Sequence, residues 1–205
     1  MIKESRNARI AVLVSGGGTN LQALIDAEKS GKIKSGRIEL VISNKADAYA
    51  LQRAEKAGIK TALAIKKELG SAEAFENRIM SLLDEAKIDF IVLAGFMAIL
   101  SERFTSAYPE RIINVHPSLI PSFCGKGFYG LRVHEEALKY GVKVTGATVH
   151  FVNEIPDGGR IIMQKAVAIR KNDTPESLQK RVMEVAEWKI LPAAVEKVCR
   201  ELIGR

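Results

Sequence analysis

The sequence predicts an α/β fold: a Rossmann-like, mostly parallel twisted sheet with flanking helices and a C-terminal hairpin that adds antiparallel strands. In the first half, strand-sized apolar runs alternate with segments of helical spacing, the pattern of parallel strands joined by right-handed crossovers. Farther along, two long extended runs flank a turn-rich segment, which indicates a hairpin. A length of 205 residues predicts a single domain over residues 1–205.

The elements of the first half follow from apolar periodicity and from Gly and Ser punctuation. The expected strands are Arg9–Val14, Arg37–Ser43, Lys60–Ala64, Asp89–Ala94 and Arg111–His116. The expected helices are Thr19–Lys29, Asp47–Ala57 and a segment that Ser71 caps and that runs through Lys87. Ligands of parallel sheets bind beyond the carboxyl ends of the strands. The segments Ser15–Asn20, Gly95–Leu100 and Asn114–Ser118 should therefore converge at one edge.

The second half predicts an enlarged hairpin of Lys143–Val152 and Arg160–Ile169. The last helical segment begins at Asp173–Pro175, a cap followed by proline at the first helical position, and extends to Leu202. Pro192 should break or kink this helix, because proline lacks the N–H of the helical hydrogen bond.

Composition excludes several classes of function. The hydrophobic fraction of 47% and the net charge of +7 are those of a basic globular protein, and the basic residues are scattered, so we expect no nucleic-acid partner. No apolar run is long enough to span a bilayer, and the N-terminal segment 1–7 lacks the apolar core of a signal peptide. We therefore expect a cytoplasmic protein with no membrane partner. The oligomeric state is left open, with a homodimer as one candidate.

Residues Gly16–Asn20 follow the first strand and open the first helix. Glycines let the backbone approach an anion, and a helix N-terminus offers free N–H groups, so this turn could bind a phosphate. It matches neither the dinucleotide-binding motif nor the P-loop. The alternative is a tight turn that binds nothing.

Asn114 and His116 end the fifth strand, on the same face, and Asp157 lies in a Pro-Asp-Gly-Gly turn. An amide, an imidazole and a carboxylate without an obvious paired nucleophile suit acyl transfer in which the substrate supplies the nucleophile. Asp157 could instead serve only the turn. If it lies beside His116, its charge should raise the histidine pKa.

The two other histidines and Cys124 are weaker candidates. His134 is expected to be helical and exposed, and His150 could line the site or only pack. The histidine spacing predicts no metal. A reactive thiol at Cys124 is conceivable, although its glycine-rich surroundings favour a simple loop.

The motif at Asn114–Pro121 resembles the folate-dependent formyltransferase family. The resemblance extends over further motifs along nearly the whole chain: Val14–Asn20, Ile42–Asp47, Leu93–Ser101, Thr148–Val152 and Asp157–Gly159. The glycine turn is similar to that of members acting on glycinamide ribonucleotide in purine biosynthesis. The resemblance implies transfer of the formyl group of 10-formyltetrahydrofolate to the amine of that nucleotide, without a metal.

The resemblance also implies site residues. Asn114, His116 and Asp157 are implied to be catalytic. The implied nucleotide-binding residues are Gly16, Gly17, Gly18, Thr19, Asn20 and Glu187. The implied folate-binding residues are Ala72, Met97, Ala98, Ile99, Leu100, Asn114, Asn153, Glu154, Ile155, Pro156 and Asp157. Ala72 and Ala98 stand where relatives have arginine. If those arginine side chains bind the folate tail, folate is bound differently here; if the main chain makes the contact, little changes.

Three alternatives remain from the sequence. A formyltetrahydrofolate deformylase shares the Asn, His and Asp pattern, but does not need a phosphate-binding turn. A methionyl-tRNA formyltransferase shares the core and adds an RNA-binding domain. A non-catalytic nucleotide-binding module would use the glycine turn alone.

Overall fold

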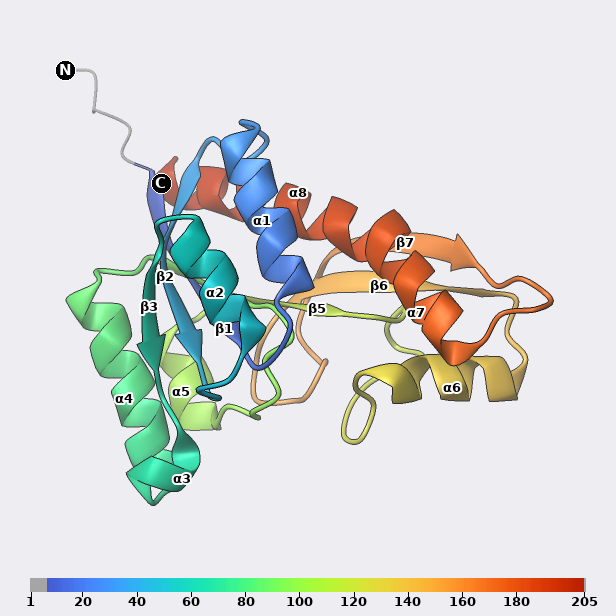
Figure 1. The fold of residues 1–205 in the computed structure, drawn as a ribbon, viewed down its shortest axis with the longest axis horizontal. Helices are drawn as coiled ribbons and strands as arrows, with labels where there is room; N and C mark the ends of the chain where they lie inside the picture. Colours follow the sequence, from blue (N-terminus) through green and yellow to red (C-terminus); the bar gives the residue numbers. More distant parts are fainter. Residues whose placement is uncertain (1–6, 205) are drawn as a thin grey trace. The chain divides into compact units, whose positions relative to one another are not determined.

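The computed structural model describes residues 7–204 (Figure 1). It has the predicted Rossmann-like α/β class, with a seven-stranded mixed sheet. The chain divides into two compact units, residues 1–100 with 195–205, and residues 101–194. The prediction of a single domain over 1–205 stays a prediction. The prediction of no signal peptide rests on segment 1–7, of which residues 1–6 lie outside the described residues. No helix within 7–204 has the length and apolar character that a membrane crossing requires.

The first unit contains four parallel strands in the order β3-β2-β1-β4. Their bounds are Ala8–Val14 for β1, Gly36–Ser43 for β2, Lys60–Leu63 for β3 and Phe90–Leu93 for β4. The predicted strands are confirmed to within one or two residues. As expected of a parallel strand covered on both faces, β4 is buried throughout.

The helices of this unit connect its strands. They are α1 (Thr19–Lys29), α2 (Tyr49–Lys56), the short α3 (Lys66–Leu69) and α4 (Ala72–Glu85). Helices α1 and α2 lie side by side next to β2 (Figure 1). As predicted, Ser71 caps α4, because its hydroxyl accepts a hydrogen bond from the Ala74 N–H at 3.0 Å.

The second unit contains β5 (Ile112–His116), β6 (Val144–Phe151) and β7 (Ile161–Ala168), which pair in antiparallel order. The predicted hairpin is thus confirmed as β6 and β7. Helices α5 (Glu102–Ala107) and α6 (Leu131–Tyr140) flank β5 in the sequence. Helix α7 (Pro175–Val182) begins as predicted, with Thr174 in a capping box and proline at the first position.

Pro192 does not break the last helix, and the alternative of a kink at Pro192 stays a prediction. The chain passes from α7 through five residues of π-helix, Met183–Glu187, into α8 (Trp188–Ile203), and Pro192 lies inside α8. The irregular turn therefore precedes the proline. Proline is tolerated here only at the loss of one hydrogen bond, to the carbonyl four residues earlier.

Candidate active site

The strand β5 carries the predicted amide and imidazole on one face. Antiparallel pairing with β6 sets Asn114 opposite His150 and His116 opposite Thr148. Directly opposed residues of antiparallel strands share a face of the sheet. The pairing therefore brings His150 to the predicted site, although its sequence context left its role open.

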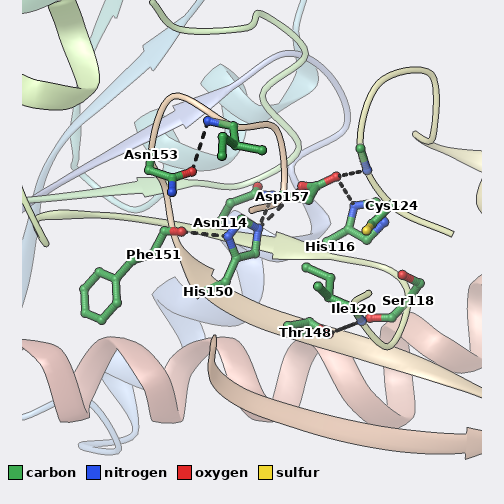
Figure 2. Close-up of polar contacts among 12 residues, drawn as sticks. Asn114, His116, Ser118, Ile120, Cys124, Thr148, His150, Phe151, Asn153 and Asp157 are labelled. Carbon is green, nitrogen blue, oxygen red and sulfur yellow. Dashed lines mark hydrogen bonds and ion pairs between the residues drawn. The ribbon is translucent and has the colours of Figure 1, made fainter. Parts of the chain in front are cut away.

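Asp157 lies between two histidines (Figure 2). Its Oδ2 is 3.4 Å from His116 Nδ1, and its Oδ1 is 3.5 Å from His150 Nε2. Oδ2 also accepts a hydrogen bond from the Gly125 N–H at 2.8 Å. The side chain is 13% exposed, and those of the two histidines are 5% or less. One carboxylate thus joins two buried imidazoles.

The turn that carries Asp157 explains how it reaches this position. Asp157 has φ of 56°, in the left-handed region, which aspartate tolerates better than most residues. The Gly158 N–H donates to the Ile155 carbonyl at 2.9 Å and closes the turn. The turn role and the site role of Asp157 are therefore compatible.

The other ring nitrogen of His116 is also engaged. Its Nε2 is 2.9 Å from the Phe123 carbonyl oxygen. A carbonyl only accepts, so Nε2 carries the proton and Nδ1 faces Asp157. His116 is thereby held in one orientation by the loop that follows β5.

The pKa of His116 is lowered, not raised as expected. Burial of the ring lowers it most, the charge of Asp157 raises it, the bond to Phe123 raises it and the charge of His150 lowers it. The expected influence of Asp157 is present, but burial outweighs it. Burial therefore favours the neutral ring of His116, and an imidazolium formed there gives up its added proton readily.

The carboxylate stays ionised despite its burial. Burial alone would raise the pKa of Asp157, but the hydrogen bond with His150, the charge of His116 and the Gly125 N–H together hold the pKa below its ordinary value. Asp157 is thus a charged acceptor at neutral pH.

His150 is the residue whose role the sequence could not decide. Its Nδ1 donates to the Phe151 carbonyl at 2.8 Å, and its Nε2 is 3.3 Å from Asn114 Nδ2. Because the carbonyl needs a proton on Nδ1, Nε2 is the nitrogen that faces Asp157 and Asn114. His150 thus connects the amide and the carboxylate of the site (Figure 2).

A hydroxyl on β6 anchors the loop after β5. Thr148 Oγ1 donates to the Ser118 carbonyl at 2.7 Å and accepts from the Ile120 N–H at 3.1 Å. Gln164 on β7 donates to the same oxygen at 3.0 Å. These bonds fix the start of the loop whose later residues, Phe123 and Gly125, contact the histidine and the carboxylate.

His134 is helical, as expected, but fully buried and not exposed. Burial and the charge of His116 lower its pKa to about 4. Its position on the covered face of α6 with Val133 and Ala137 explains the difference, because the sequence did not show which face of that helix would pack.

Cys124 is half-buried and its thiol donates to the Pro121 carbonyl at 3.3 Å. Burial and the charge of Asp157 raise its pKa. A raised pKa disfavours the thiolate, which is the nucleophilic form. The arrangement favours a structural role for this thiol.

In the first unit, two of the three segments expected to converge do so. Ser15 Oγ accepts a hydrogen bond from the Met97 N–H at 2.8 Å, which joins the turn after β1 to the segment after β4. The third segment, Asn114–Ser118, belongs to the second unit. Gly16 and Gly17 are exposed at the glycine turn, and α1 begins at Thr19 without a side-chain cap.

The residues assigned to folate by resemblance lie in several segments. Met97 is 51% exposed and Ile99 73%, whereas Leu100 is buried. Ile155, on the loop before Asp157, is 58% exposed. Ala72 is the first residue of α4 and is exposed.

The assigned ribose contact, Glu187, is buried at 5% exposure in the π-helical turn. Within residues 7–204 no group of three or more His, Cys, Asp or Glu side chains is arranged to hold a metal ion.

Comparisons with known proteins identify the family of this chain. The sequence matches the formyl transferase family over residues 8–195. The human trifunctional purine biosynthetic protein adenosine-3 is 47% identical over 195 residues, which are 95% of this chain and 19% of that protein. This chain thus spans only a small part of such trifunctional relatives.

Relatives of similar length also match. Phosphoribosylglycinamide formyltransferase of Escherichia coli (strain K12) is 43% identical over 91% of this chain and 84% of its own length. The crystal structure of glycinamide ribonucleotide transformylase 1 from Symbiobacterium toebii matches with a TM-score of 0.89 and 40% identity, over 95% of this chain and 89% of that chain. With a family match over most of its length, this chain belongs to the formyl transferase family.

Proposed function

We propose that this chain transfers the formyl group of 10-formyltetrahydrofolate to the amine of glycinamide ribonucleotide. The names of its relatives support formyl transfer to that nucleotide, and the family resemblance of the sequence implies the folate donor. The observation that carries the proposal is the carboxylate of Asp157 between His116 and His150, beside the amide of Asn114. The ring nitrogens of both histidines face carbonyl, amide or carboxylate groups. This arrangement moves protons and stabilises charge, and leaves the nucleophile to the substrate.

In the proposed reaction, the amine nitrogen attacks the formyl carbon and forms a tetrahedral intermediate. Asn114 and protonated His116 donate hydrogen bonds to its oxyanion, each donor being worth roughly 3–4 kcal/mol. His116 exchanges its bond with the Phe123 carbonyl for this oxyanion and keeps Asp157 at Nδ1. Asp157 helps to carry the proton from the amine to folate N10. The bond from the formyl carbon to N10 then breaks.

The ligand sites are part of the same proposal. The phosphate of the nucleotide binds the amides of Gly16–Asn20, and Glu187 contacts the ribose. The pterin lies near Met97–Leu100 and Asn153–Asp157, mainly on main-chain groups. Support for the first site comes from the exposed Gly16 and Gly17 that precede α1, because glycines before a helix N-terminus let the backbone approach an anion closely.

A formyl-transfer assay with both substrates tests the proposal. Purified chain should consume 10-formyltetrahydrofolate only when glycinamide ribonucleotide is present, and the formylated nucleotide should appear in equal amount. Formate release at the same rate without the nucleotide would instead make the chain a deformylase. Nucleotide binding without any turnover would leave a non-catalytic module.

A further inference from the structure

Helix α2 holds the carbonyl groups of the glycine turn. The Ala50 N–H donates to the Gly16 carbonyl at 3.0 Å, and Arg53 Nε donates to the Gly17 carbonyl at 2.8 Å. In a trans peptide, the C=O and the following N–H point in opposite directions. Since both carbonyls face α2, the N–H groups of Gly17 and Gly18 face away from it.

The turn lies close against α2 on one side and is open on the other. A Cβ on Gly18, which has φ of 71°, would come within 2.6 Å of Ala50 Cβ. A Cβ on Gly16 or on Gly17 would meet nothing within 4 Å. Successive N–H groups that face one open side form an anion-binding concavity.

Arg53 is itself fixed by its neighbours. Its Nη1 donates to Gln22 Oε1 at 3.1 Å, and its guanidinium carbon lies 5.0 Å from the centroid of the Tyr49 ring. Both hydrogen bonds end on neutral oxygens, so within residues 7–204 the charge of Arg53 is not paired with a carboxylate. It adds positive potential beside the turn as well as orienting it.

We propose that Arg53 is a positioning residue for the phosphate of the nucleotide substrate. By holding the Gly17 carbonyl toward α2, it directs the Gly18 N–H to the open side of the turn, where the phosphate binds. This inference rests on the proposed function only in assigning the nucleotide phosphate to Gly16–Asn20.

The test compares Arg53→Met, Arg53→Lys and Lys56→Met. Lys56 is the matched control, because its Nζ lies 5.8 Å from the centroid of the same Tyr49 ring and it is exposed. Arg53→Met should raise the KM for glycinamide ribonucleotide by about tenfold, the scale of losing a hydrogen bond from a charged donor, with kcat and the KM for folate unchanged. Arg53→Lys keeps the charge but cannot form both hydrogen bonds of the guanidinium, to Gly17 and to Gln22. On a logarithmic scale, it should therefore reverse less than half of the rise in the nucleotide KM. Lys56→Met should behave as the parent.

Several results would overturn the inference. They are an unchanged nucleotide KM in Arg53→Met, an equal rise in Lys56→Met, or full restoration by Arg53→Lys, which would leave charge alone as the cause. Calorimetric titration of the same variants with ribose 5-phosphate gives a second reading that needs no turnover. If the parent bound ribose 5-phosphate and Arg53→Met did not, but no formyl transfer occurred, the proposed function would fail and the role of Arg53 would stand. If Arg53→Met bound ribose 5-phosphate as the parent does, the role of Arg53 would fail whatever the activity.

Discussion

Replacing Asp157 by asparagine removes the charge at the centre of the site and little else. The left-handed φ of 56° at this position suits asparagine as well as aspartate. The amide oxygen of asparagine can still accept the hydrogen bond from the Gly125 N–H. We therefore expect Asp157→Asn to fold and to bind both substrates.

The magnitude follows from the contact of 3.4 Å between Asp157 Oδ2 and His116 Nδ1. The charge of Asp157 is the largest influence that raises the pKa of His116 against burial. An opposite charge at such a distance favours the charged ring, so the imidazolium should be rarer in the variant at neutral pH. Loss of the proton acceptor itself costs about 10²–10⁴-fold. Turnover should fall by at least about 10²-fold, the smallest value of that range.

A pH–rate profile of formyl transfer checks this reasoning, with calorimetric titration of both ligands as the binding control. The charged form of His116, which is the stronger hydrogen-bond donor, is lost as the pH rises through its pKa, so this limb of the profile should move to lower pH in Asp157→Asn. Glu135→Gln, which removes an exposed carboxylate from α6, should leave rate and profile unchanged. Parent-like turnover with an unmoved profile in Asp157→Asn would leave Asp157 a turn residue and would refute the argument.

The remaining predictions concern four other residues. His116→Ala should abolish transfer in a folded protein, and Asn114→Ala should lower kcat by about 10²–10³-fold; a change confined to KM would make Asn114 a binding residue. Gly17→Val should weaken nucleotide binding and spare folate binding in titrations. A Cβ at position 17 meets no atom within 4 Å, so the valine side chain would obstruct only the anion. Equal loss of both ligands would indicate misfolding. The lowered pKa of His134, about 4, should make stability fall as the pH drops from about 6.5 toward 4, since the unfolded chain binds that proton first. His134→Leu should flatten this part of a plot of Tm against pH.

The strands and long helices could be predicted because their apolar residues repeat with the period of the element that buries them. The strand β1 and the helix α4 begin and end within two residues of the expected positions. Short elements such as α3 and α5 were not predicted, because four and six residues give less than two helical turns of pattern. The π-helical turn of Met183–Glu187 before α8 was not predicted either.

The catalytic candidates could be predicted only as far as local spacing reaches. Asn114 and His116 share a face because strand side chains alternate, which the sequence shows. The position of His150 opposite Asn114 depends on the register of β5 with β6. That register joins residues far apart in the sequence, so local spacing does not show it. The net lowering of the His116 pKa depends on how deeply the ring is buried, which periodicity does not give.

The two histidines cannot both be charged without opposing each other, and this restricts what the site does. The charge of His150 lowers the pKa of His116, while one carboxylate faces both rings. Asp157 is held ionised, so it compensates one imidazolium and not two. In the proposed reaction the imidazolium that Asp157 supports is that of His116. The proposed reaction moves one proton from the amine to N10, which matches that capacity.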